Sequence, residues 1–430
     1  MFENEMDQAG CPVFVQQYSI VKGILEKLTI RDLLSISKVC RTWSEVARVV
    51  RQQRKNAAQT FLWHPYGDHT SEVFEYYNGC SISDECQRFI DTAPDFGFPS
   101  VQELTQEQSW SPLFPQLRSA IIKDFNASFS EPQLMVVVAT AAVDEYMPSD
   151  EDNITKLKII LSEIPRAIPC LVTISYGIVG SVKDKPISLE MENCEVPLVA
   201  GLRIPKVAGL FVKMFTVTKE TNNKYKGKVD QENCQTILNI QPTDNVKAIV
   251  LFHTQVQKAG ALKDAVFQYI KGHPHVALGG GAHYRNLASV CQGDFVPIGA
   301  GLIICGNDNV NVASVGLYDT KISKRNEEKL IEMKGCEFPD GDSFAFMFAC
   351  NGRGANMHGG KCHVESTLFR KHFPNTSLIG TFTGGEYCHE VIPSRDVPAP
   401  PKFASSIEFA YTTVFVFVSY KYPTKHSVRS

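Results

Sequence analysis

Between residues 20 and 46, the apolar residues recur with the spacing of a helix in two stretches. They are Ile20, Val21, Ile24, Leu25 and Leu28, then Leu33, Leu34, Ile36, Val39, Cys40, Trp43 and Val46. A polar break over residues 29–32 separates the two stretches. Some fifty residues are too few to bury this much apolar surface by themselves. The pattern therefore predicts a small helical domain at residues 14–56 whose exposed apolar face binds a partner. It follows a tail at residues 1–13 that we expect to be disordered.

From about residue 60 the pattern changes to short apolar runs that end at glycine or proline. A repeated unit is visible, in which an apolar strand is followed by a second strand and a glycine turn, with a helix between the strands. The first strands lie at 134–139, 246–252 and 343–349, and the second strands at 170–174, 274–279 and 374–379. Further strands at 299–305, 313–317 and 411–420 extend the sheets. The chain is thus predicted to hold a large α/β domain from about 60 to 425, built from repeated strand-helix-strand units.

Composition narrows the classes of partner. The net charge of −3 over 430 residues favours neither direct binding of nucleic acid nor binding to an anionic membrane. The thirteen cysteines, an odd number without CxxC pairs, are typical of reduced thiols inside the cell. No secretory leader and no apolar run of membrane-spanning length is visible in this sequence. We expect a cytoplasmic and nuclear protein.

The richest polar cluster follows the strand at 343–349. Glycines let a ligand approach the backbone, an arginine can clamp a carboxylate, and a glutamate can hold an amine. The candidate substrate- or ligand-binding residues are Cys350, Arg353, Glu365, Gly384, Gly385 and Glu386. Strand ends of this kind are where α/β sheets bind ligands. The other interpretation is that the glycines shape turns while Arg353 forms a structural ion pair with Glu365 or Glu386.

Other chemistry finds less support in the sequence. A zinc site would have to use Cys350, His358, Cys362, His363, Cys388 and His389, but these lack the close pairs of structural zinc sites. A Cys350 nucleophile with His358 or His363 as base has no local signature. The histidines at 253, 273, 275 and 283 are interpreted as surface or satisfied core residues. We expect no metal site, no cofactor and no catalytic constellation.

The sequence Asp-Leu-Leu at 32–34, followed by Val-Cys-Arg-x-Trp at 39–43, resembles the F-box. The usual Leu-Pro opening is absent, and Gln-Tyr-Ser stands at 17–19 instead. The resemblance implies that the helical domain binds Skp1 and, through it, the cullin and RING subunits of a ubiquitin ligase. The implied Skp1-binding residues are Ile24, Leu28, Leu33, Leu34, Val39, Cys40 and Trp43.

The stretches FAFMFACNGRG at 344–354 and ESTLFRKHFPNTSLIGTFTGGE at 365–386 are similar to the C-terminal part of a FIST domain. That resemblance implies an N-terminal FIST half at 60–240 and a C-terminal half at 241–425. Microbial FIST domains are thought to sense small ligands such as amino acids, whereas F-box relatives present proteins, including chromatin and transcription regulators, for ubiquitination. The expected function is a non-catalytic substrate receptor. The alternative is a sensor of an amino-acid-like ligand.

Overall fold

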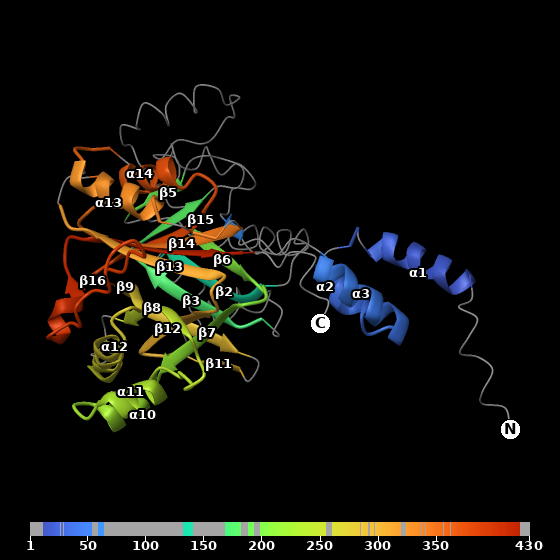
Figure 1. The fold of residues 1–430 in the computed structure, drawn as a ribbon, viewed down its shortest axis with the longest axis horizontal. Coiled ribbons are helices and arrows are strands. Elements are labelled where there is room, and N and C mark those ends of the chain that lie inside the picture. Colours follow the sequence, from blue (N-terminus) through green and yellow to red (C-terminus); the bar gives the residue numbers. More distant parts are fainter. Residues whose placement is uncertain are drawn as a thin grey trace, which may run out of the picture.

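The computed structural model describes the chain in segments. They are 12–25, 27–28, 30–53, 59–63, 132–140, 168–181, 188–192, 198–254, 260–283, 285–290, 293–295, 297–319, 324–336, 338–339, 341–355, 357–361 and 363–421. Residues 1–11 of the tail predicted at 1–13, and the helix of the first repeat, lie outside these residues. Figure 1 shows three helices near the N-terminus and a larger body of sheets and helices.

The N-terminal helices are α1 (Pro12–Leu25), α2 (Ile30–Ile36) and α3 (Arg41–Gln53). The helix therefore begins at Pro12, within the segment predicted as tail, and the break between α1 and α2 falls where the sequence predicts it. The three helices share a small core of their own, made of Leu25, Leu33, Val46, Ala47 and Val50.

The described strands of the larger body form three six-stranded sheets with one common order. The first sheet runs β1 (Gln59–Trp63), β6 (Val199–Pro205), β2 (Pro132–Thr140), β3 (Cys170–Ser175), β10 (Arg285–Val290), β11 (Gly293–Phe295). The second runs β7 (Leu210–Val217), β12 (Gly299–Gly306), β8 (Val246–Thr254), β9 (Ala277–His283), β16 (Glu386–His389), β17 (Glu408–Phe409). The third runs β13 (Val310–Leu317), β18 (Thr413–Tyr420), β14 (Asp342–Cys350), β15 (Ser377–Thr383), β4 (Gly177–Ser181), β5 (Ser188–Met191).

In each sheet the two middle strands are parallel and every other pairing is antiparallel. These parallel pairs, β2–β3, β8–β9 and β14–β15, are the repeated units that the sequence predicts. Where the intervening helix is described, it is α12 (Gly260–Gly272) or α14 (Val364–His372). The strands β12, β13 and β18 match the predicted extensions of the sheets, so this part of the prediction is confirmed.

Each repeat gives its last two strands to a different sheet. The strands β4 and β5 of the first repeat join the third sheet, β10 and β11 of the second join the first, and β16 and β17 of the third join the second. The exchange is cyclic, from the first repeat to the third sheet, from the third repeat to the second sheet and from the second repeat to the first sheet. Each sheet therefore contains strands of two repeats. The proposed division into halves at residue 240 remains a prediction, since the sheets join strands from both sides of that position.

Successive side chains of each strand point to opposite faces of the sheet and pack into two different apolar cores. One face of all three sheets packs on a shared apolar interior, to which Val136, Val250 and Phe346 contribute. The opposite face of the second sheet is covered by α10 (Lys219–Tyr225), α11 (Gln231–Ile237) and α12. The third sheet is covered by α13 (Lys324–Lys334) and α14. The outer layer of helices and the inner core are the physical reason for the near-continuous apolar runs, since a strand buried on both faces needs apolar residues at successive positions.

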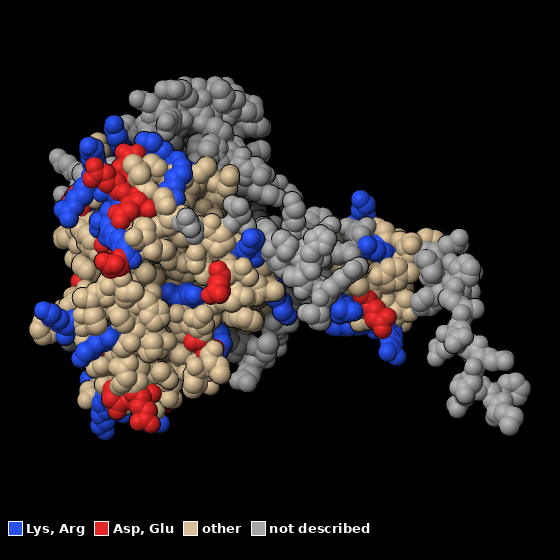
Figure 2. All heavy atoms as spheres, in the orientation of Figure 1, with Lys and Arg blue, Asp and Glu red and all other residues tan. Residues whose placement is uncertain are grey.

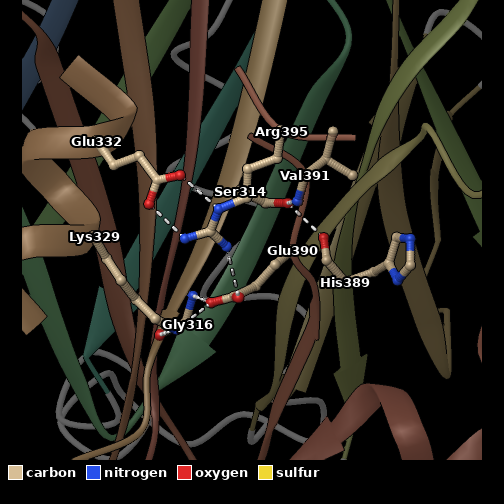
Figure 3. A network of polar contacts seen from close by, with 8 residues as sticks. All are labelled: Ser314, Gly316, Lys329, Glu332, His389, Glu390, Val391 and Arg395. Carbon is tan, nitrogen blue, oxygen red and sulfur yellow. Dashed lines mark hydrogen bonds and ion pairs between the residues drawn. The ribbon is translucent and has the colours of Figure 1, made fainter. Parts of the chain in front are cut away.

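The segment after β16 is held to α13 by polar contacts (Figure 3). Lys329 donates from Nζ to Glu390 Oε1 at 2.5 Å, and Arg395 forms a two-pronged ion pair with Glu332. Ser314 on β13 donates from its hydroxyl to the carbonyl of His389 at 2.5 Å.

Among the described residues, no helix combines the length and apolar character needed to cross a bilayer.

Candidate functional site

The first candidate site is an apolar face of the N-terminal helices. Ile20 and Ile24 on α1 are 63% and 51% exposed, and Val39, in the turn before α3, is 66% exposed. Cys40 is exposed beside Val39. Exposed aliphatic side chains of this size on a unit with so small a core are typical of a protein-binding surface.

The predicted Skp1-binding residues divide by burial. Ile24, Val39 and Cys40 are exposed, while Leu28 and Trp43 are half-buried. Leu33 is fully buried in the core between the helices, so its direct contribution is to the stability of this unit. The side chain of Leu34 lies outside the described residues. Of the seven predicted residues, three are therefore exposed enough to contact a partner directly, and their role stays a prediction.

The second candidate site lies at the end of β14, where the loop 351–354 begins. Here Arg353 is 1% exposed and all three of its guanidinium nitrogens donate within the chain. Nε and Nη2 donate to Glu365 Oε1 on α14, and Nη1 donates to the carbonyls of Asp319 and Tyr411 at 2.9 and 2.8 Å. Thr413 on β18 donates to the other carboxylate oxygen of Glu365. This geometry agrees with the structural ion pair that the sequence left open.

Glu386 lies beside this ion pair at the start of β16. It is 1% exposed, and it accepts hydrogen bonds from Thr383 Oγ1 at 2.8 Å and from the Thr412 backbone N–H at 3.3 Å. Burial raises the pKa of Glu386 to about 7. Burial and the neighbouring Glu386 raise the pKa of the Cys350 thiol, which disfavours the thiolate that a nucleophile requires.

The turn at Gly384 and Gly385 completes the predicted cluster. The Gly384 N–H donates to the Ala282 carbonyl, and the Ala282 N–H donates to the Gly385 carbonyl, both at 2.9 Å. Gly385 has a φ of +150°, a conformation that favours glycine. The structure therefore brings all six predicted residues together at the ends of β14 and β15.

Two further carboxylates belong to this region although sequence analysis missed them. Glu190 on β5 accepts from the backbone N–H of Ser366 at the start of α14, and Glu192 accepts from the N–H of Ala355. Burial, reinforced by the nearby Glu365, raises the pKa of Glu190 to about 8. Because β5 reaches the third sheet only through the exchange of strands between repeats, no local pattern reveals this contact.

His283, at the end of β9, was interpreted as a surface or satisfied core residue. It is fully buried, with its ring 5.2 Å from that of Phe252 and 6.2 Å from that of Phe348. Neither of its ring nitrogens has a hydrogen-bond partner of normal geometry among the described residues, although backbone groups of Gly281 and His253 lie beside the ring. Burial lowers the pKa of His283 to about 3.

The described residues contain no cluster of three His, Cys, Asp or Glu side chains placed to hold a metal ion. Cys362, one of the ligands considered above, lies outside them. The face shown in Figure 2 carries Lys, Arg, Asp and Glu side chains of both signs over α13 and α14, where Lys371 pairs with Glu327. Mixed charge of this kind favours no polyanionic partner on this face.

Residues 18–52 match the F-box domain family. The chain is 27% identical over 243 residues to F-box only protein 22 of Homo sapiens, and 26% identical over the same length to that of Pongo abelii. Each alignment spans 53% of this chain and 57% of the relative.

Among solved structures, the cyanuric acid hydrolase of A. caulinodans covers 67% of this chain and 90% of its own, at 6% identity. Its TM-score of 0.31 is too low to support an argument about fold or function.

Proposed function

Because this chain carries an F-box domain and is a divergent relative of F-box only protein 22, we propose that it is the substrate-recognition subunit of a Skp1-cullin-F-box ubiquitin ligase. The helical unit binds Skp1, and through Skp1 the cullin and RING subunits. The α/β domain captures protein substrates for ubiquitination and proteasomal degradation, with chromatin or transcription regulators as the substrate class. In this role the chain itself performs no chemical step.

The observation that carries the proposal is the exposed apolar face of α1 and of the turn before α3. Ile24 and Val39 lie outside the small core, so they are free to contact a partner without unfolding the helices. The usual Leu-Pro opening of the F-box is absent, which leaves the contact more dependent on these residues.

Co-purification with Skp1 and cullin tests the proposal. The double variant Ile24→Asp, Val39→Asp should lose Skp1, because binding would bury two unpaired charges in an apolar contact. Leu33→Asp is unsuitable because Leu33 lies in the core, where a charge would unfold the helices.

Ile331 on α13 is 51% exposed and provides a matched control. Ile331→Asp places the same charge on an exposed aliphatic position outside the F-box and should retain Skp1. Wild-type protein that recovers no Skp1, or a double variant that binds as well as Ile331→Asp, would exclude this function.

The alternative from the sequence is a sensor of an amino-acid-like molecule through Arg353 and Glu386. That function requires the ligand carboxylate to replace Glu365, because each guanidinium nitrogen already has a partner. Both carboxylate oxygens of Glu386 also accept hydrogen bonds within the chain. The contacts of these two residues therefore support the substrate receptor over the amino-acid sensor.

A further inference from the structure

A proline-rich stretch lies between β16 and β17, and Skp1 binding does not use it. Residues 395–401 read Arg-Asp-Val-Pro-Ala-Pro-Pro. In this order an arginine precedes two pairs of an apolar residue and a proline, Val397 with Pro398 and Pro400 with Pro401. SH3 domains recognise proline-rich segments that share the PxxP pattern. An arginine two residues before the first pair is the flanking basic residue of one class of these ligands.

The prolines hold this segment in the polyproline II conformation. Each proline fixes its own φ at about −65°, and a residue before proline is restricted to extended backbone, so all of 397–401 are constrained in this way. Pro398 is half-buried and Pro401 is buried, whereas the residues at 396, 397, 399 and 400 are exposed. The two residues that face the domain are three positions apart, which is the period of a polyproline II helix. The rest of this helix faces solvent.

Few contacts hold the segment to the domain. Among the described residues, the backbone of 396–402 makes no hydrogen bond. Arg395 pairs with Glu332 on α13, but the arginine side chain is 43% exposed, and water screens ion pairs of this kind (Figure 3). A partner that lifts the segment would break this ion pair and expose Pro401. A groove that binds both the arginine and the prolines would replace what is lost.

The side chains of the segment define the chemistry of such a partner. Val397 is 62% exposed and Pro400 is exposed, and both suit a groove lined with aromatic rings. A guanidinium pairs best with carboxylates, so the partner needs acidic residues at the Arg395 end of its groove. Because the prolines set the conformation before binding, little conformational entropy is lost in the complex. These are the properties of an SH3 groove.

We propose that residues 395–401 bind an SH3 domain. Val397 with Pro398, and Pro400 with Pro401, fill its aromatic groove. Arg395 leaves Glu332 and pairs with the carboxylates beside that groove. The segment lies outside residues 18–52, which match the F-box, so the SH3 domain binds independently of Skp1.

Calorimetric titration of the full-length chain tests this proposal. The probe is a purified SH3 domain whose known ligands carry the arginine before the PxxP pattern. We expect saturable binding to the wild type. Arg395→Ala should weaken it about tenfold, the loss that one charge-assisted hydrogen bond gives. Lys402→Ala is the matched control, since it removes an exposed basic residue at the other end of the segment and should bind as the wild type does.

The ion pair provides a readout that a folding defect does not imitate. Glu332→Ala removes the internal partner of Arg395, so the arginine is free for the SH3 domain and binding should tighten by up to about fivefold. Loss of the same ion pair from its two sides therefore has opposite effects on binding. A chain that is merely destabilised would bind more weakly in both variants.

Val397→Asp is the second variant, because an exposed side chain can be changed without unfolding the domain. It should abolish binding by placing a charge in the aromatic groove. A wild-type chain that does not bind the SH3 domain would overturn the proposal. So would a larger loss from Lys402→Ala than from Arg395→Ala, or binding to a WW domain in place of the SH3 domain. None of these results bears on Skp1 recovery, so the two proposals fail separately.

Discussion

The guanidinium of Arg353 shows at the residue scale how burial changes the role of a charged side chain. The sequence places an arginine among glycines at a strand end, where a ligand clamp is a reasonable hypothesis. In the structure the side chain is buried and its nitrogens are bonded to Glu365 and two carbonyls. The residue therefore fixes α14 and the segment just before β18 to the loop 351–354.

Removing one partner of this ion pair should strongly destabilise the α/β domain. Glu365→Ala leaves the Arg353 charge buried and uncompensated, so we expect a loss of about 3–5 kcal/mol in the free energy of unfolding. Thermal or denaturant unfolding measures it. The exposed pair Arg395–Glu332 is the control (Figure 3). Glu332→Ala should cost no more than about 1 kcal/mol. Equal losses in the two variants would contradict the structural role of Arg353.

The raised pKa of Glu190 predicts how the free energy of unfolding depends on pH. Its pKa is about 8 in the folded protein and 4.5 as the unperturbed value, so between these values the folded state binds the proton more tightly than the unfolded state. Stability from this group is therefore present below pH 4.5 and is lost as pH rises through 8. Buried histidines act in the opposite direction only below about pH 6.5, the ordinary pKa of His.

Glu386, with a pKa of about 7, also titrates between pH 6.5 and 8, so the effect of Glu190 on unfolding is isolated by comparing the wild type with Glu190→Gln in this window. The wild type should lose stability as pH rises through this window, whereas Glu190→Gln, which stays uncharged and keeps an oxygen for the Ser366 N–H, should lose less. Gln at the exposed position Glu328 is the control and should follow the wild type. The same slope in all three proteins would show that Glu190 does not titrate here.

At the scale of elements, the close approach of the second and third sheets depends on Gly281 in β9. A Cβ atom at this position would lie 2.3 Å from Thr383 Cγ2 and 2.6 Å from its Cβ. The neighbour is the branched base of a buried side chain, which cannot move away. The sequence shows three consecutive glycines at 279–281 but not the strand that they face.

Gly281→Ala should therefore destabilise the α/β domain by about 1–3 kcal/mol through overpacking. Gly23→Ala provides the contrast. Gly23 lies within α1 with nothing within 4 Å of the added Cβ, so alanine should stabilise that helix by up to about 1 kcal/mol. Unfolding of the two variants checks both signs. A neutral Gly281→Ala would mean that the sheets are not packed at this position as described.

At the scale of the whole molecule, the cyclic exchange of strands should make the three sheets unfold together. Opening any one sheet exposes strands that belong to another repeat, so partial unfolding loses contacts in two sheets at once. Among the residues that the structure describes, α1–α3 share no core with the sheets, so we expect these helices to open separately.

Native-state hydrogen exchange tests this arrangement. The amides of β2, β8 and β14, one central strand from each sheet, should exchange with the same opening free energy. The amides of α3 should exchange at a lower opening free energy. A central strand that exchanges well before the other two would show that its sheet unfolds alone.

Particular elements show how much of the structure the sequence predicts. The apolar runs at 134–139, 246–252 and 343–349 predict β2, β8 and β14, because a strand buried on both faces needs apolar residues at consecutive positions. Helical spacing and the break at 29–32 predict the helices on either side of it, although the second break, at 37–40 between α2 and α3, is not predicted. The six polar and glycine residues of the third repeat do lie together. These features follow from local rules of burial and turn formation.

Contacts between distant segments could not be predicted in this way. Glu190 reaches α14, and Gly281 meets Thr383, only because strands are exchanged between repeats. Burial decided that Arg353 is an internal ion pair, that Leu33 is a core residue and that His283 lacks a hydrogen-bond partner of normal geometry among the described residues. The sequence by itself determined which segments become strands and helices, since that depends on local apolar spacing. The tertiary structure decided which polar groups are paired with one another, because pairing depends on residues that are far apart in the chain.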